Sequence, residues 1–291
     1  MVLRSARRLD QALRDRELTR CDLRWPSLAT ADLTGSRVLE VLSRGKHLLL
    51  RTGHDLTLHS HLRMEGSWQI QPSERPLPAG ARGEQIRAVL GNERWTAVGY
   101  RLGLLDLVPT ADEHTVVGHL GPDLLGPDWD EAAAVANLAT VADRPIGEAL
   151  LDQRLLAGIG TFYLAETCFL RGLSPWTPVG EVPDLSALVA LARRLMLANV
   201  ARAVQSTTGD LREGARQWVH ARSGRPCRRC ATTVRVATVG VPPRDRTAFW
   251  CPHCQPGLAP TDDGRSQAPL GARRRSGPAP GADRRSGRSA G

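Results

Sequence analysis

The sequence predicts an α+β protein with three parts: an N-terminal helix packed with a β-sandwich, a helical domain, and a four-cysteine zinc ribbon. Three observations lead to this class. Apolar residues recur at helical spacing near the start, short strand-like segments with turns fill positions 37 to 108, and two Cys-x-x-Cys pairs lie at 227–230 and 251–254. With 291 residues, of which 41% are hydrophobic, the chain can build two domains and a small module.

The first part combines one helix with six strands. Residues 3–13 place Leu3, Ala6, Leu9 and Leu13 on one helical face. Gly91-Asn92-Glu93 is a hairpin signal between two of the strands, and Pro- and Gly-containing turns at 118–127 mark a boundary. The predicted strands are 37–42, 47–51, 56–61, 85–90, 94–98 and 104–108.

The second part is helical, with helices expected at 131–138, 146–153, 161–171 and 184–205. Gly158 and Gly160 open the third of these helices. Glycines there let a backbone approach closely, and the free N–H groups at a helix start bind anions such as phosphate. By itself, this Gly-Ile-Gly segment also fits an ordinary tight turn between two helices.

The third part is the cysteine ribbon. Cys227-Arg-Arg-Cys230 and Cys251-Pro-His-Cys254 are separated by twenty residues that can form a hairpin, which is the spacing of a four-thiolate zinc site. Disulfides or free thiols are the alternative. Many arginines surround the cysteines, so the ribbon is expected to face phosphate, although a purely structural zinc staple with solvated arginines remains open.

Composition limits the function classes further. The formal charge is +9, no apolar run is long enough to cross a membrane and no signal peptide opens the chain, which predicts a cytoplasmic protein associated with the nucleoid. Cys21 and Cys168 have no partners at ligand spacing and are expected to be small buried hydrophobes. Residues 258–291 carry seven Arg against three Asp and predict a disordered tail that adds nonspecific nucleic-acid affinity.

Lys46 is the only lysine among 39 Lys and Arg residues. Arginine can replace lysine where only positive charge is needed, but it cannot replace an amine that must change its protonation state. Lys46 therefore either holds a position that chemistry restricts or survives by accident in a chain biased toward arginine.

Five ordered motifs resemble the formamidopyrimidine-DNA glycosylase / endonuclease VIII family, particularly its endonuclease VIII-like actinobacterial members, over residues 1 to about 256. The motifs are Arg44-Gly-Lys-His-Leu48, His61-Leu-Arg-Met-Glu-Gly66, His119-Leu-Gly-Pro-Asp123, Leu151-Asp-Gln153 with Ala157-Gly-Ile-Gly160, and Arg246-Thr-Ala-Phe-Trp-Cys251.

The resemblance implies a base-excision repair enzyme. Members of the family remove oxidised bases from DNA after the base leaves the stack. An N-terminal proline amine attacks C1′, and the resulting Schiff base allows β-elimination of the 3′ phosphate. One structural zinc ion shapes the finger, and the expected partner is double-stranded DNA that contains damaged bases or abasic sites. The enzyme is expected to act as a monomer.

The resemblance also implies roles for individual residues. Lys46 matches the hairpin lysine beside the lesion sugar and its phosphate, and Arg246 matches the finger arginine that grips phosphates. Met64 matches a residue that fills the gap left by the everted base. The remaining expected DNA contacts are Arg101, Gln153, Gly158, Gly160 and Thr161, and the expected zinc ligands are Cys227, Cys230, Cys251 and Cys254. His59 and His61 are expected to be structural.

The chain departs from the family pattern at its start. Family members continue after methionine with Pro-Glu-Gly-Asp-Thr, whereas this chain reads Met1-Val-Leu-Arg-Ser5. Two interpretations are open: the start codon is assigned too late, or the protein binds damaged or abasic DNA without cutting it.

Two further departures are milder. Thr161 stands where the family usually has asparagine, and its hydroxyl offers shorter reach and fewer hydrogen bonds. Tyr100-Arg-Leu-Gly103 stands where a formamidopyrimidine glycosylase has Arg-Arg-Phe-Gly, which favours oxidised pyrimidines over 8-oxoguanine.

The expected domain organisation follows from these parts. Residues 1–118 form a β-sandwich domain of the catalytic type, and residues 125–215 form a helix–two-turns–helix DNA-binding domain. Residues 216–257 form the zinc finger, and 258–291 form the tail.

Overall fold

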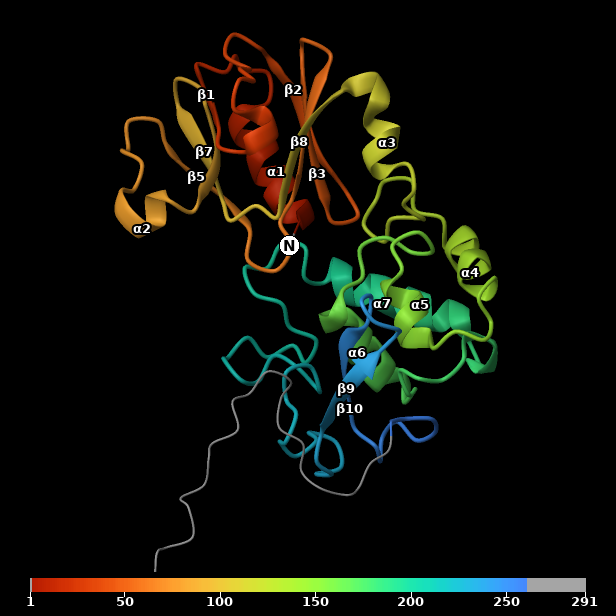
Figure 1. The fold of residues 1–291 in the computed structure, drawn as a ribbon. Coiled ribbons are helices and arrows are strands. Elements are labelled where there is room, and N and C mark those ends of the chain that lie inside the picture. Colours follow the sequence, from red (N-terminus) through yellow and green to blue (C-terminus); the bar gives the residue numbers. More distant parts are fainter. Residues whose placement is uncertain (1, 261–291) are drawn as a thin grey trace, which may run out of the picture.

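The computed structural model describes residues 2–260, so Met1 and most of the predicted disordered tail lie outside the described residues. The chain forms two lobes (Figure 1), and the region where they face each other is here called the interlobe cleft. The first described helix begins on the side of the first lobe that faces the second lobe (Figure 1). Among the described helices, none is long and apolar enough to cross a bilayer.

The first lobe is a sandwich of two antiparallel four-stranded sheets. One sheet has the order β2-β3-β4-β8, formed by Val38–Arg44, His47–Thr52, Leu56–His61 and Leu104–Pro109. The other has the order β1-β6-β7-β5, formed by Arg20–Leu23, Ile86–Gly91, Trp95–Tyr100 and Ser67–Pro72.

Helix α1 (Val2–Leu13) packs between these sheets, as Figure 1 shows. Leu9 and Leu13 are buried in the same core as Leu48, Leu58 and other strand residues. The predicted helix and sandwich are therefore confirmed, and short helices α2 (Gly80–Gly83) and α3 (Glu113–Val117) extend the lobe. Single 3-10 turns lie at Pro26–Leu28 and Thr110–Asp112.

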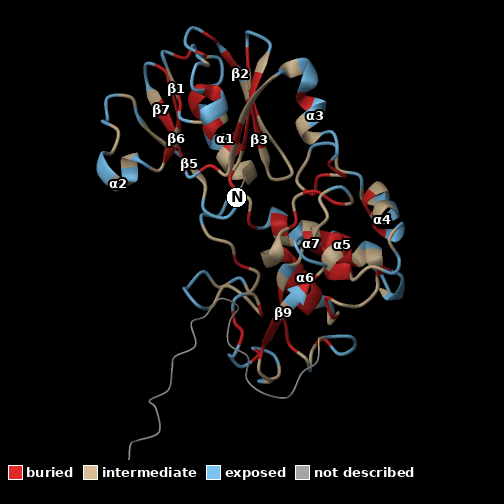
Figure 2. Cartoon of the chain, viewed as in Figure 1, coloured by how far each residue is buried: buried red, intermediate tan, exposed pale blue. Residues whose placement is uncertain are grey.

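The second lobe holds four helices and one hairpin. The helices are α4 (Glu131–Ala139), α5 (Ile146–Leu151), α6 (Thr161–Arg171) and α7 (Leu185–Leu197), with a 3-10 turn at Val179–Glu181. Strands β9 (Arg235–Val239) and β10 (Arg246–Trp250) pair antiparallel and pack against α6. Figure 2 shows buried residues concentrated inside each lobe.

Two predicted helices are shorter than expected. The prediction of 146–153 was too long, because Asp152 leaves the helical region at ψ 104° and ends α5. The prediction of 184–205 was also too long. The side chain of Asn199 donates to the carbonyls of Leu195 and Ser206, and this local hydrogen bonding competes with continued helix beyond Leu197.

Candidate active site in the interlobe cleft

The tip of the β2–β3 hairpin bridges the two lobes. The Gly45 N–H donates to Oδ2 of Asp123 at 2.7 Å, and the Arg44 guanidinium donates to the Gly121 carbonyl at 3.3 Å. Gly45 has φ +58°, and a methyl group there would come within 3.2 Å of the Ala157 side chain. Glycine is therefore needed for both the turn conformation and the close approach.

Lys46 follows in the same hairpin and reaches across the cleft. Its Nζ donates to the carbonyl of Ile159. Burial, and after it the nearby positive charge of Arg246, together lower the pKa of Lys46 from 10.5 to about 8. An amine with this pKa is charged at neutral pH and still gives up its proton far more readily than an exposed lysine does.

The Gly-Ile-Gly turn on the opposite side is held by Gln153. Oε1 of Gln153 accepts from the Gly158 N–H at 3.0 Å, and Nε2 donates to the Ile159 carbonyl at 3.1 Å. The Ile159 carbonyl thus accepts hydrogen bonds from both Gln153 and Lys46. The amide of Gln153 is engaged within the turn, so this residue orders the turn by its own hydrogen bonds.

Gly158 and Gly160 meet two backbone requirements of this turn. Gly158 has φ +108°, a conformation that other residues rarely adopt. Gly160 precedes the first residue of α6, Thr161, and no side chain caps the helix there. Within the described chain, the N–H groups of this first turn are therefore available to an anion.

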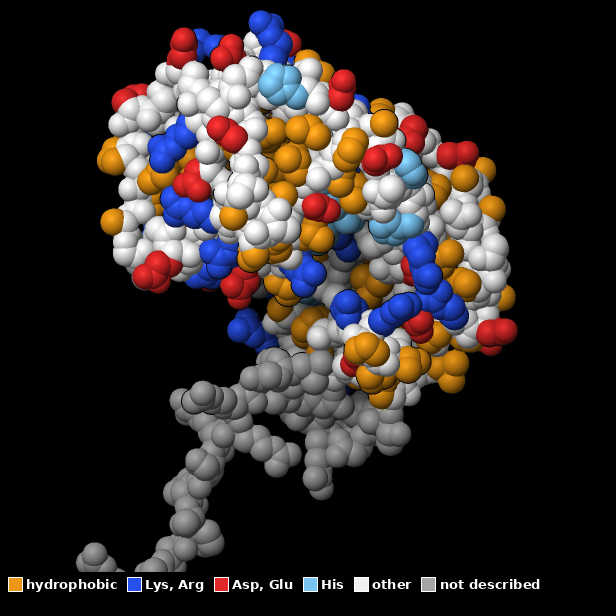
Figure 3. Space-filling view, turned by 45° about the horizontal axis from the view of Figure 1, so that its top comes forward, with side chains coloured by type: hydrophobic (Ala, Val, Ile, Leu, Met, Phe, Trp, Pro, Cys, Tyr) orange, Lys and Arg blue, Asp and Glu red, His pale blue; other side chains and the backbone are white. Residues whose placement is uncertain are grey.

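Arg246 begins β10 and lines an open pocket of about 460 Å³ together with His119, Arg144, Gln153, Arg154 and Arg244. Arg154 and Arg144 hold the carboxylate of Asp152, and these hydrogen bonds keep its pKa well below its usual range. In the part of the chain that the structure describes, Arg244 and Arg246 form no ion pair with a carboxylate. Figure 3 shows Lys and Arg side chains gathered around the hollow between the lobes.

The loop after β4 presents Met64 to solvent, because 95% of this residue is exposed. Arg101, in the turn after β7, has φ +45° and donates to Gln85 at 3.0 Å and Glu65 at 3.2 Å. The adjacent Leu102 is buried with 3% exposure. In this turn, the charged side chain therefore faces outward and the apolar one belongs to the core.

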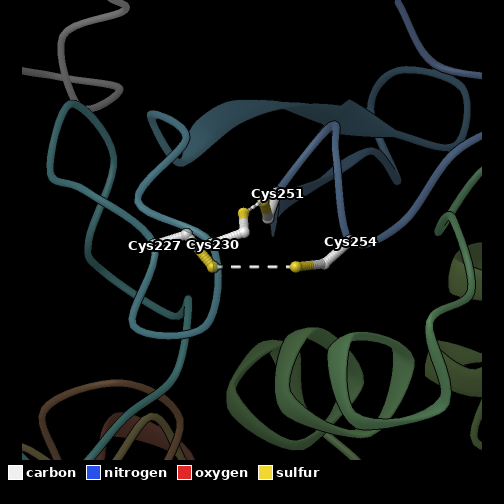
Figure 4. A group of neighbouring side chains, drawn as sticks. All are labelled: Cys227, Cys230, Cys251 and Cys254. Atoms are coloured by element: carbon white, nitrogen blue, oxygen red, sulfur yellow. Dashed lines mark hydrogen bonds between the residues drawn. The ribbon is translucent and has the colours of Figure 1, made fainter.

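The four ribbon cysteines converge (Figure 4). Their sulfur atoms all lie within 4.8 Å of one another, with Cys230 and Cys251 3.4 Å apart and Cys227 and Cys254 3.9 Å apart. These distances are too long for disulfide bonds. They fit a tetrahedral ion with metal–sulfur bonds of about 2.3 Å, which separate the sulfurs by roughly 3.8 Å. The cluster can therefore hold one metal ion.

Two buried carboxylates in the second lobe hold backbone N–H groups, a role that the sequence did not indicate for either residue. Asp123 is 2% exposed and accepts N–H groups from Gly45 and Leu125. Glu166 is fully buried and accepts the backbone N–H groups of Trp218, Val219 and His220. Asp123 lay within a recognised motif, whereas Glu166 sits mid-helix with no local signal.

A family model for the formamidopyrimidine-DNA glycosylase N-terminal domain matches residues 2–101. The chain is also 54% identical over 268 residues to a probable endonuclease 8 of Streptomyces coelicolor, covering 91% of this chain and 96% of that protein. The chain belongs to the formamidopyrimidine-DNA glycosylase / endonuclease VIII family. This confirms the resemblance read from the five motifs.

A further relative and a solved structure are also similar to this chain, the second in fold. A DNA-(apurinic or apyrimidinic site) lyase of Mycolicibacterium smegmatis is 44% identical, covering 87% of this chain and 96% of that protein. The fold is similar to that of Lactococcus lactis formamidopyrimidine-DNA glycosylase, whose structure was solved in complex with DNA containing FAPY-dG. The TM-score is 0.72 at 22% identity, covering 88% of this chain and 98% of that one.

Proposed function

We propose that this protein is a base-excision repair enzyme that removes oxidised bases from DNA and then cleaves the abasic site. The observation that carries the proposal is the convergence of Lys46, Arg246 and the Gly-Ile-Gly turn in one basic cleft. The names of the relatives, an endonuclease 8 and an abasic-site lyase, support the same activity.

The chemistry needs an amine, a phosphate grip and room for a displaced base. An amine of the protein attacks C1′, and the C1′–N bond to the base breaks. The C1′–O4′ bond then breaks as O4′ takes up a proton, which opens the sugar ring and leaves an imine between C1′ and the amine. The imine acidifies the hydrogens at C2′. Loss of one of them as a proton expels the 3′ phosphate, which leaves with the C3′–O bonding electrons.

We assign three roles to the cleft residues. The Lys46 amine lies beside the sugar and exchanges a proton there, because its lowered pKa suits that task. Arg246 and the free N–H groups at the start of α6 bind the flanking phosphates. Met64, exposed and unbranched, enters the space that the everted base vacates.

The buried position of Leu102 bears on the lesion class. The loop that holds it offers no apolar wedge, so we propose oxidised pyrimidines as the preferred substrates. Zinc is the proposed occupant of the cysteine cluster, where it would stabilise the ribbon and supply no chemistry to the reaction.

Borohydride trapping on an oligonucleotide with one abasic site tests the activity. We expect a covalent adduct and a cleaved strand. If the protein binds the oligonucleotide but yields neither product, the proposed enzymatic activity is contradicted. That result would support the alternative, in which the protein binds damaged DNA without cutting it.

Substitution of Lys46 tests its role. Lys46→Arg keeps the charge but cannot release a proton at neutral pH, so cleavage should fall on the order of 100-fold while affinity for abasic DNA changes little. Lys46→Met removes both properties and should weaken binding as well. If Lys46→Arg lost binding and cleavage equally, Lys46 would act only by contacting phosphate and would not exchange a proton.

A further inference from the structure

Four histidines lie close together beside Lys46, with His47 in contact with the other three, and have no place in the reaction described above. They are His47 on β3, His59 and His61 on β4, and His119 in the loop after α3, here called the histidine group. The ring of His47 stacks on His59 with centroids 5.0 Å apart and meets His61 edge-on at 4.9 Å. His119 lies 6.3 Å from His47 and lines the pocket that contains Arg246.

Two of these rings share a hydrogen bond. Nδ1 of His47 and Nε2 of His59 are 2.7 Å apart, so one ring carries the proton and the other accepts it. Nε2 of His47 is not among the buried unpaired atoms and has no protein partner in the described chain, which leaves it open to the solvent of the cleft. The pair therefore runs from an accessible nitrogen to an interior one.

The inner end of the pair is unusual. His59 is 2% exposed, and its Nδ1 is buried without a hydrogen-bond partner among the described residues. Such groups are rare in folded proteins, and each calls for an explanation. Burial lowers the pKa of His59 and lowers that of His47 to about 3, so both rings are neutral at rest and hold an added proton only transiently. Asp106 lies directly opposite His59 on the neighbouring strand β8, and its negative charge works against the lowering at His59.

His61 differs from the pair. Its Nδ1 accepts the N–H of Arg63 at 2.9 Å, so in the neutral ring the proton resides on Nε2. Nε2 of His61 therefore already carries a proton and cannot accept another. Burial and the nearby charge of Lys46 lower its pKa to about 4, which keeps the ring neutral at pH 7.

We propose that His47 and His59 form a proton relay that carries a proton from the reacting sugar to the interior, toward Asp106. The proposal rests on the proposed lyase function. It assigns a new role to the pair.

The transfer conserves protons and electrons. In the starting state His47 carries its proton on Nδ1 and His59 carries its proton on Nδ1. A proton leaving C2′ of the imine adds to the lone pair at Nε2 of His47, through a water where the gap requires one. The Nδ1 proton of His47 then passes to Nε2 of His59. This leaves a neutral His47 and a protonated His59 opposite Asp106, and the reverse transfer returns the proton to solvent after the phosphate has left.

The first test is the position of the protons, because it needs no activity. Two-dimensional NMR of the full-length protein with ¹⁵N-labelled histidine distinguishes the two neutral tautomers of each ring. We expect protonated Nδ1 and unprotonated Nε2 on both His47 and His59. A proton on Nε2 of His47 at neutral pH would overturn the relay, since that nitrogen could then accept nothing.

The second test separates the relay from the imine step. His59→Gln can keep a hydrogen bond to His47 but cannot pass a proton onward. We expect undiminished borohydride trapping and abasic-site affinity, strand cleavage slower on the order of 100-fold, and loss of the solvent deuterium isotope effect on cleavage. His114→Gln, which changes an exposed histidine on α3 outside the group, is the matched control and should behave like the unmodified protein.

The outcomes are distinguishable. If the unmodified protein cleaves and His59→Gln cleaves equally fast, only the relay is wrong. If the unmodified protein forms no imine, the proposed function fails and the relay fails with it. The relay would also be overturned if His59→Gln keeps the melting temperature of the unmodified protein but loses both borohydride trapping and cleavage. That result would mean that His59 is needed to form the imine, a step that precedes the proton transfer.

Discussion

At the scale of single residues, Lys46 shows how a functional position can oppose stability. Its amine is largely buried, and no carboxylate pairs with it among the described residues. The protein tolerates the burial of a charge here because the Ile159 carbonyl accepts one of its hydrogens.

This arrangement predicts a pH-dependent gain in stability for Lys46→Met. The pKa is about 8 in the folded protein and 10.5 when unfolded, so the unfolded chain binds more protons between these values and stability rises with pH across that window. Lys46→Met should therefore be more stable than the unmodified protein by up to about 3 kcal/mol at pH 7, with the advantage fading near pH 10. Urea denaturation at both pH values measures it.

Lys46→Arg is the matched control for this stability effect, because its charge persists at pH 10. A Lys46→Met advantage of the same size at both pH values would mean that the charge is not the cause.

Met64 provides the complementary case of an apolar side chain without a packing role. Since 95% of the residue is exposed, Met64→Ala should change the free energy of unfolding by less than about 0.5 kcal/mol. Affinity for DNA with an abasic site should nevertheless fall several-fold, measured by fluorescence anisotropy. Leu39→Ala, at a 46% exposed position on β2, should alter neither quantity. Unchanged affinity in Met64→Ala would remove this residue from the DNA interface.

The sequence could indicate some of these positions and not others. Lys46 stood out because it is the only lysine, and the cysteines because of their spacing. The contact between Gly45 and Asp123 could not be foreseen, since it joins residues 78 positions apart and depends on how the lobes dock. His59 was expected to be structural, but no local pattern placed its ring against His47.

At the scale of elements, strand prediction succeeded where apolar residues cluster. The strands β3, β4, β6 and β8 lie within a residue or two of the predicted ranges. Two strands were missed. β1 has four residues with one buried, and β5 combines Trp68 and Ile70 with two glutamines, so neither produced a strand signal strong enough to stand out.

Glu166 shows how one side chain can organise a segment without regular structure. Its carboxylate accepts three consecutive backbone N–H groups, from Trp218 to His220, and the hydroxyl of Thr207. A carboxylate can satisfy several donors at once, and the interior strengthens these hydrogen bonds.

Glu166→Gln should therefore destabilise the protein by about 2–4 kcal/mol, because the NH₂ group of glutamine would face backbone N–H groups and could not accept their hydrogen bonds. Thermal unfolding followed by circular dichroism measures the loss. Glu131→Gln on α4, where the carboxylate accepts from Ser186 at an exposed site, should cost less than about 0.5 kcal/mol. Similar costs for both variants would show that the buried carboxylate is dispensable.

At the scale of the whole molecule, the cysteine ribbon shares its core with the helices. Val236, Phe249 and Cys251 belong to the same buried cluster as Leu164 and Phe169 of α6. The Arg229 guanidinium lies 4.6 Å over the Phe169 ring, and Trp218 stacks on that ring as well. The ribbon is thus continuous with the second lobe.

Removal of the metal should consequently reach beyond the cysteines. We expect about one zinc ion per chain, and we expect chelation to abolish DNA binding and to speed hydrogen exchange in β9, β10 and α6. The first lobe has its own core and should keep its protection. Mass spectrometry of exchanged peptides resolves the two lobes. Full DNA affinity in a metal-free protein would refute the dependence.

The docking of the β2–β3 hairpin also affects the protein during its synthesis. Residues 44–46 belong to a sandwich that can close once Pro109 has emerged, yet their partners extend to Ile159 and Arg246. Domains generally fold in the order in which they leave the ribosome. A chain whose translation ends soon after the first lobe would contain a folded first lobe but would lack the residues that complete the cleft. Prematurely ended translation products of this repair protein should therefore be harmless to the chromosome.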